Sequence, residues 1–200
     1  MKIYLSDNLC NIDPIKTINN IIDKSIQINS PDIRRNASII KSKNTLLIDV
    51  FDTFIEPAKT DFDVWFIKQE GAAEFVLARD FRKGFMEFKT FYSSIGGNVA
   101  VHSDALYNRD FDTIRKEWEQ KYVESKFVKY YFGKEYSKEF KGIRIKDFQK
   151  MCDIIGCNPR DSMIISDGGN DILSAIYSNI DILLVPRFST NKEFDYRILI

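Results

Sequence analysis

The chain has little cysteine and almost no histidine, and these residues form no recognisable metal-binding or disulfide pattern. Its 200 residues include three cysteines, Cys10, Cys152 and Cys157, and a single histidine, His102. The cysteine spacing fits no zinc motif, and an odd number of cysteines argues against a disulfide framework. We therefore expect a protein of a reducing compartment, with the cytoplasm as the default location.

Long hydrophobic runs are also absent. The apolar stretches are far shorter than the roughly 18–20 residues that a membrane-spanning helix needs. Residues 1–7 reach an acidic side chain too early for a secretory signal peptide. The sequence therefore predicts no membrane segment and no signal peptide.

The chain has no net charge, because 29 basic side chains balance 29 acidic ones. A neutral chain creates no overall field that would attract nucleic acid or a membrane surface, so neither partner is indicated. The charges are unevenly distributed along the chain, because segment 126–150 carries eight basic and three acidic residues. This segment is either a solvated surface or the rim of a site that attracts an anionic substrate.

What the chain does contain is enough apolar material for one sizeable domain, with 44% hydrophobic and 14% aromatic residues. Beyond residue 44, strand-like and helix-like patterns alternate, which predicts an α/β fold with a parallel sheet. We expect strands at 45–50, 98–101, 127–132, 162–166 and 181–185, and helices at 81–94, 110–124, 146–155 and 171–177. The stretch 56–78 is expected to be a short irregular insert.

Residues 1–43 are expected to form an N-terminal extension that precedes a main domain at 44–200. Asp13 can cap a helix with Pro14 at its first position, and isoleucines at helical spacing follow. The sequence does not indicate what this extension does.

Two stretches rich in carboxylates each follow an apolar run. Residues 46–48 lead into Asp49, with the hydroxyl of Thr53 four positions later, and residues 163–165 lead into the segment 166–171. Because ligands bind at the carboxyl ends of strands in open α/β sheets, we expect these carboxylates to converge. A carboxylate there can act as a nucleophile or hold a metal ion. The two stretches together predict a magnesium-binding site for phosphoryl transfer.

This arrangement resembles the haloacid dehalogenase superfamily, most of whose members are magnesium-dependent phosphatases. The first motif of the family matches at 49–53 and the fourth at 166–171, whereas Ser103 fits the second motif. Lys146 fits the third motif best, in competition with Lys134, Lys138 and Lys141. The resemblance covers about residues 45–186 and implies a Rossmann-like parallel sheet flanked by helices, with a small cap or none.

The resemblance also implies the catalytic and metal-binding roles. Asp49 would attack phosphorus and form an aspartyl-phosphate, while Lys146 would pair with Asp49 and with the phosphoryl oxygens. Mg²⁺ would be held by Asp49, by the backbone carbonyl of Phe51, and by Asp167 and Asp171 directly or through water.

Further residues are candidates for substrate binding. Ser103 would donate a hydrogen bond to the phosphoryl group, and Gly168 and Thr53 are further candidates, although Thr53 also suits a role in bracing the turn. His102 precedes Ser103 on the same expected strand, so its side chain is expected to point away from that of Ser103.

One part of the family pattern is missing. The family's phosphatases carry an aspartate, acting as general acid and base, two residues after the nucleophile; here that position is Phe51, and Asp52 lies one step further on. Losing such a group costs roughly 10²- to 10⁴-fold in rate. The preferred function is nevertheless a magnesium-dependent phosphohydrolase, acting on a phosphoprotein or another large anionic substrate. The alternatives are a dehalogenase- or phosphonatase-like hydrolase and a catalytically degenerate interaction module.

Overall fold

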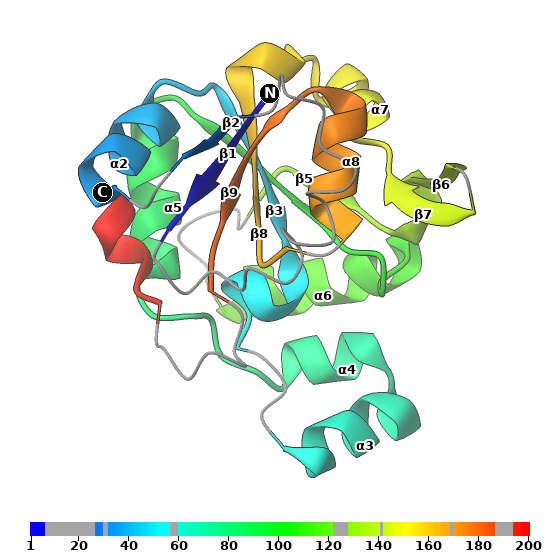
Figure 1. Ribbon diagram of the computed structural model, residues 1–200. Helices are drawn as coiled ribbons and strands as arrows, with labels where there is room; N and C mark the ends of the chain where they lie inside the picture. The colour runs from blue at the N-terminus through cyan, green and yellow to red at the C-terminus, as the bar shows by residue number, and fades with distance from the viewer. Residues whose placement is uncertain are drawn as a thin grey trace.

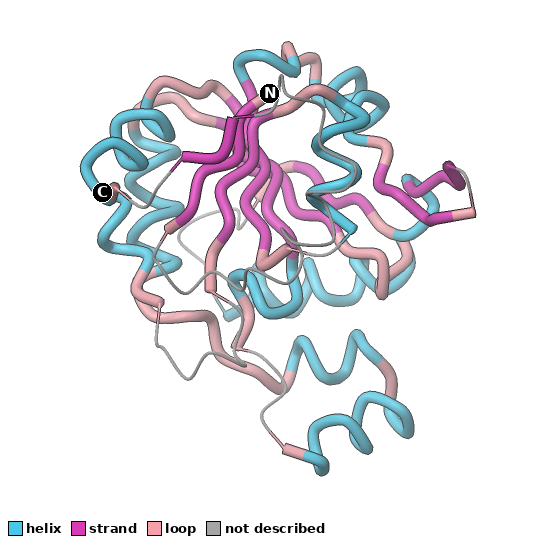
Figure 2. Tube along the Cα trace, in the orientation of Figure 1, coloured by secondary structure: helices cyan, strands magenta, loops and turns pink. Residues whose placement is uncertain are grey.

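The computed structural model describes residues 1–6, 27–29, 32–56, 60–121, 128–140, 142–168, 170–186 and 194–200. Within these ranges the chain forms a seven-stranded sheet with helices on both faces and a separate two-stranded hairpin (Figures 1 and 2). This confirms the predicted α/β class. No helix in the described ranges is long and apolar enough to cross a membrane.

All strand pairs in the large sheet are parallel, as predicted. Strand β3 lies between β8 and β4, so the residues that follow these three strands meet at one edge of the sheet. The order across the sheet is β2 (Gln27–Asn29), β1 (Lys2–Leu5), β9 (Asp181–Leu184), β8 (Ser162–Ser166), β3 (Thr45–Asp49), β4 (Asn98–His102) and β5 (Tyr130–Phe132).

The N-terminal segment contributes to this sheet, which the sequence analysis did not foresee. Strand β1 pairs with β9, with Ile3 opposite Ile182, and both side chains are fully buried. Helix α2 (Ile33–Lys41) follows β2 and leads into β3. The helix expected after Asp13 lies outside the described residues. The first strands of the chain are therefore part of the main core.

The predicted helices of the main domain are present, with one correction. They correspond to α5 (Phe85–Ser94), α6 (Asn108–Lys121), α7 (Phe148–Ile155) and α8 (Asn170–Ser178). The prediction that Lys146 begins a helix is wrong, because this residue ends strand β7 (Ile143–Lys146) of an antiparallel hairpin with β6 (Ser137–Phe140). Helix α7 starts after Asp147, whose carboxylate accepts a hydrogen bond from the backbone of Lys150 and so caps the helix.

The expectation of irregular structure at 56–78 is also wrong. This insert contains two short helices, α3 (Asp61–Glu70) and α4 (Ala72–Leu77), which project from the body of the domain (Figure 1). Thr60 and Asp63 form a capping box, in which each side chain accepts a hydrogen bond from the other residue's backbone N–H. This reciprocal cap starts α3 although its apolar residues do not follow a single face.

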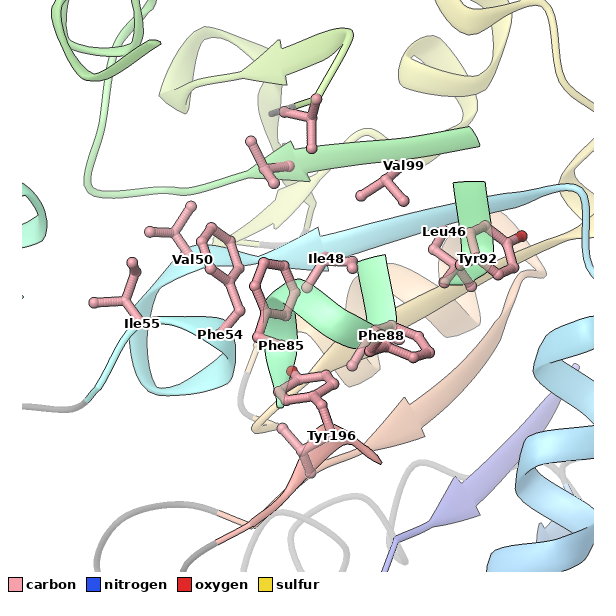
Figure 3. Close-up of a cluster of buried hydrophobic side chains, with 14 of the residues drawn as sticks. Leu46, Ile48, Val50, Phe54, Ile55, Phe85, Phe88, Tyr92, Val99 and Tyr196 are labelled. Atoms are coloured by element: carbon pink, nitrogen blue, oxygen red, sulfur yellow. The ribbon is translucent and has the colours of Figure 1, made fainter. Parts of the chain in front are cut away.

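An aromatic cluster packs beneath the turn that follows β3 (Figure 3). Phe54 stacks on Phe85 of α5 with 4.6 Å between ring centroids, and Tyr196 meets Phe85 edge-on at 5.2 Å. The hydroxyl of Tyr196 also donates a hydrogen bond to the backbone carbonyl of Thr53 (2.9 Å). The cluster therefore anchors the turn after Asp49 to helix α5 and to the C-terminal segment.

We expect Phe85→Ala to lower the free energy of unfolding by about 3–5 kcal/mol, because the fully buried ring leaves a cavity among other rings. Urea denaturation followed by circular dichroism measures the change. Phe62→Ala is the matched control, since Phe62 is 64% exposed on α3 and its loss is expected to cost no more than about 0.5 kcal/mol. Equal destabilisation by the two variants would contradict the assignment of this core.

Candidate active site

A cavity of about 360 Å³ opens beside the carboxyl ends of β3, β4 and β8. The structure brings together most of the residues predicted from the sequence, and it adds Asp104, Ala105 and Asn170. The predicted residues that line the cavity are Asp49, Phe51, Ser103, Lys146, Asp167, Gly168 and Asp171.

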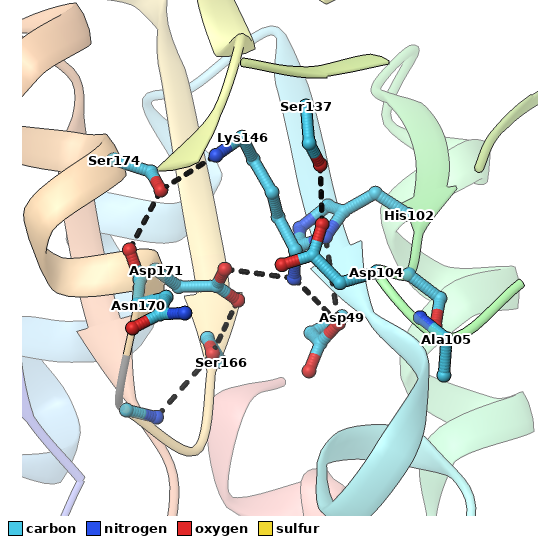
Figure 4. Close-up of polar contacts among 12 residues, drawn as sticks. Asp49, His102, Asp104, Ala105, Ser137, Lys146, Ser166, Asn170, Asp171 and Ser174 are labelled. Carbon is cyan, nitrogen blue, oxygen red and sulfur yellow. Dashed lines mark hydrogen bonds and ion pairs between the residues drawn. The ribbon is translucent and has the colours of Figure 1, made fainter. Parts of the chain in front are cut away.

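The ammonium group of Lys146 joins two carboxylates in this cavity (Figure 4). Its Nζ lies 2.9 Å from Oδ1 of Asp49 and 2.7 Å from Oδ1 of Asp171. The backbone N–H of Lys146 donates to Oγ of Ser174 on α8 (2.9 Å), which ties the end of β7 to that helix. Of the lysines that competed for this role, Lys146 is thus the one placed beside Asp49, whereas Lys141 lies outside the described residues.

The opposite charges of Lys146 and of the carboxylates of Asp49 and Asp171 stabilise one another. Burial favours the neutral form of Asp49, but the ammonium of Lys146 and the imidazole of His102 outweigh it and hold the pKa of Asp49 at about 2. Burial likewise opposes the charge on Lys146, but the carboxylates of Asp171 and Asp49 outweigh burial and raise its pKa. At neutral pH, Asp49 is therefore a carboxylate and Lys146 an ammonium.

The loop after β8 is held by its own hydrogen bonds. Oγ of Ser166 donates to Oδ2 of Asp171 (2.7 Å) and accepts from the backbone N–H of Gly168 (3.3 Å). Gly168 has a φ of 122°, which glycine adopts more readily than other residues. Both oxygens of Asp171 are thus engaged, one by Lys146 and the other by Ser166.

Two sets of side chains around these carboxylates could hold a metal ion. Asp49, His102 and Asp171 each present a ligand atom within 4.8 Å of the others, but the ammonium of Lys146 already bridges the two carboxylates there. The second set consists of Asp49 and Asp167, which line the same cavity. Carboxylate oxygens are the ligands that Mg²⁺ prefers, so the donor set of Asp49 and Asp167 fits this ion. Asp171 would then reach it through water.

His102 lies directly behind the carboxylate of Asp49. The register of β3 and β4 places the two residues opposite each other, and Nδ1 of His102 is 3.5 Å from Oδ1 of Asp49. The imidazole is fully buried against the ring of Phe148, and neither ring nitrogen has a hydrogen-bond partner in the described structure. The sequence analysis missed this contact, which depends on the register of two parallel strands.

Two polar residues of the first motif do not reach the cavity. The side chain of Thr53 is fully buried and does not line the cavity, so the structure does not support its predicted role in substrate binding. Asp52 adopts a left-handed conformation with a φ of 54° and does not line it either. Phe51 does line it, and its ring stacks on Phe75 of α4 with 6.1 Å between centroids.

Much of the basic segment 126–150 lies against aromatic rings. Lys138 lies 4.3 Å from the ring centroid of Tyr177 and pairs with Asp147 at 2.8 Å. Lys129, Lys134 and Lys150 lie over the rings of Tyr130, Tyr107 and Tyr136, respectively. Among the described basic residues of this segment, Lys146 alone lines the active-site cavity.

No family model and no curated protein matches this chain. Solved structures do match it. A hydrolase of the haloacid dehalogenase-like family from Streptococcus pneumoniae matches with a TM-score of 0.52 at 11% identity, covering 79% of this chain and 90% of that chain. A haloacid dehalogenase-superfamily hydrolase from Ehrlichia chaffeensis matches with a TM-score of 0.51 at 13% identity, covering 79% and 96%. The chain therefore has the haloacid dehalogenase-like fold.

Replacing Lys146 with methionine is expected to lower the free energy of unfolding by roughly 3 kcal/mol, because two buried carboxylates lose their shared cation. Urea denaturation provides the measurement. Lys138→Met is the matched control: Lys138 is one-third exposed, and its ion pair with Asp147 is expected to contribute no more than about 1 kcal/mol. A Lys146 variant as stable as the Lys138 variant would contradict the proposed balance of charges.

Proposed function

We propose that this protein is a magnesium-dependent phosphohydrolase that forms an aspartyl-phosphate on Asp49. The observation that carries the proposal is the ammonium of Lys146, which is shared by Asp49 and Asp171 at the wall of an open cavity. A carboxylate repels an incoming phosphate, and the adjacent fixed cation offsets this repulsion. The haloacid dehalogenase-like fold is consistent with this chemistry.

The carboxylate of Asp49 is oriented for attack by its contacts. Lys146 and His102 both lie on the side of Oδ1, so Oδ2 is the oxygen left to approach phosphorus. Ser103 lines the same cavity and would donate a hydrogen bond to the phosphoryl group. Formation of the aspartyl-phosphate and its hydrolysis by water then replace one difficult step with two easier ones.

The residues that would hold Mg²⁺ are Asp49, Asp167 and the backbone carbonyl of Phe51, with Asp171 acting through water. When bound, the ion would act as a Lewis acid and neutralise charge on the phosphoryl oxygens. Lys146 occupies the position between Asp49 and Asp171, so the protein supplies one cation itself, and Mg²⁺ would supply the second.

The substrate we propose is a phosphorylated molecule in the cytoplasm, with a phosphoprotein or another large anionic molecule as the preferred class. Among the described residues of the insert, 60–78, the structure has the two short helices α3 and α4. Such a small cap favours a site that a bulky substrate can enter. Lys134, Lys138 and Arg144 line a second cavity at hairpin β6–β7, and these basic residues support the choice of an anionic substrate.

We expect the wild-type protein to hydrolyse p-nitrophenyl phosphate when Mg²⁺ is present and to lose this activity when the ion is chelated. The leaving group of this ester needs little protonation, so its hydrolysis should not require a proton donor at position 51. Asp49→Asn is expected to lower kcat by at least roughly 10³-fold, since the nucleophile is lost. Release of p-nitrophenolate, followed by absorbance, measures both effects.

The control for this experiment is Asp112→Asn, which changes a mostly exposed carboxylate on α6 paired with Arg115. It is expected to retain wild-type kcat. An inactive wild-type protein that Phe51→Asp does not activate would refute the phosphohydrolase and favour a non-catalytic interaction module on the same fold.

Removing one proposed metal ligand is expected to change the requirement for the ion. Asp167→Asn should raise the Mg²⁺ concentration that gives half-maximal activity by at least about 10-fold, because a neutral amide binds a hard cation less well than a carboxylate does. Titration of activity with MgCl₂ measures the shift. An unchanged midpoint would exclude Asp167 as a ligand.

A further inference from the structure

We propose that Asp104 is a catalytic residue that gives a proton to the leaving oxygen of the substrate and later takes one from the attacking water. This inference rests on the proposed phosphohydrolase function and adds a role that the first motif cannot supply. An alkyl phosphate expels a strongly basic oxygen, so its rapid cleavage needs a proton donor in the cavity. Phe51 has no proton to give, and Asp52 does not line the cavity.

The other ionisable groups of the cavity already have different tasks. Lys146 is held by Asp49 and Asp171, which favour its charged form and oppose loss of its proton. Asp171 uses both of its oxygens, one for Lys146 and one for Ser166. Asp49 is the proposed nucleophile and Asp167 a proposed metal ligand. Asp104 is the remaining carboxyl group among the described residues that line the cavity.

The contacts of Asp104 suit a proton carrier. It follows Ser103 in the loop after β4 and is half-buried, and its Oδ1 accepts a hydrogen bond from Oγ of Ser137 at the start of β6 (Figure 4). No described residue donates a hydrogen bond to its other oxygen, Oδ2. One oxygen is therefore oriented by hairpin β6–β7, while the other is available to hold a proton.

Asp104 also lies near the reacting groups. Its charge acts on the ammonium of Lys146, which in turn contacts Asp49, and in Figure 4 its carboxylate lies between Ser137 and this pair. Because Asp104 lines the same cavity as Asp49, it is placed to exchange a proton with a group bound there.

The proposed steps balance in protons and charge. Oδ2 of Asp49 attacks phosphorus, the bond from phosphorus to the ester oxygen breaks, and the proton of Asp104 passes to that oxygen, so an alcohol leaves. Water then attacks the phosphorus of the aspartyl-phosphate, the bond from phosphorus to Oδ2 of Asp49 breaks, and the carboxylate of Asp104 accepts a proton from the water. Phosphate is released, and both aspartates return to their starting states.

The test compares two substrates that differ in their need for a proton, p-nitrophenyl phosphate and ethyl phosphate, with phosphate release measured in saturating Mg²⁺. We expect Asp104→Asn to lower kcat for ethyl phosphate by roughly 10²- to 10⁴-fold and for the aryl ester by no more than about 10-fold. Adding Phe51→Asp to this variant should raise kcat for ethyl phosphate by at least about 10-fold, because residue 51 lines the same cavity.

Two further variants separate this role from a structural one. Ser137→Ala removes the hydrogen bond that orients Asp104 and should selectively lower the activity on ethyl phosphate, by about 10-fold. Asp112→Asn, a matched change on the surface of α6, should preserve the wild-type ratio of the two activities.

Three results would overturn the proposal. Equal losses on the two esters in Asp104→Asn would indicate a structural role, and a wild-type protein that cleaves only the aryl ester would show that the site has no proton donor. If the wild-type protein cleaves neither ester, the phosphohydrolase function itself fails, and this role fails with it. The aryl ester thus distinguishes failure of the proposed function from failure of this inference.

Discussion

The contact on which the site depends is the ammonium of Lys146 between the carboxylates of Asp49 and Asp171. It joins strand β3 of the large sheet to strand β7 of the hairpin and to helix α8, although β3 is far from the other two in the sequence. Removing charged groups from water is costly, and such a cluster persists only when its members are paired and hydrogen-bonded. Ser166 and Ser174 supply those additional bonds, to the carboxylate of Asp171 and to the backbone of Lys146. The geometry of the proposed active site and the packing of the hairpin therefore depend on the same contacts.

This arrangement also makes the two oxygens of Asp49 unequal. Oδ1 faces Lys146 and, on the buried side, the imidazole of His102, whereas Oδ2 has no partner among the described residues. Because His102 is fully buried and packs on Phe148, the carboxylate has little room to rotate backward. The strand register beneath the site thus leaves Oδ2 as the oxygen that would react in the proposed mechanism, and preorganisation of this kind lowers the cost of reaching a reactive geometry.

The sequence predicted those features that depend on local pattern. Apolar runs ending in polar residues identified β3, β4 and β8, and this was enough to bring Asp49, Ser103 and Asp167 to one cavity. Lys146 was also identified, although in a helix rather than at the end of a strand. The missed features need tertiary information: β1 is short and is stabilised by β9, while α3 has exposed aromatic residues and no single apolar face. The contacts of His102 and Asp104 depend on partners in distant segments, so no local spacing in the sequence predicts them.

The phenylalanine at position 51 has a structural consequence as well as a chemical one. Its ring stacks on Phe75, so the turn after Asp49 is joined to the small helical insert by an apolar contact, where a carboxylate would need water or a partner. A proton donor on the loop after β4 would be held by Ser137 of the hairpin instead. The same hairpin ends in Lys146, which contacts Asp49, the proposed nucleophile. Hairpin β6–β7 therefore orients both Asp49 and Asp104, through Lys146 and Ser137 respectively.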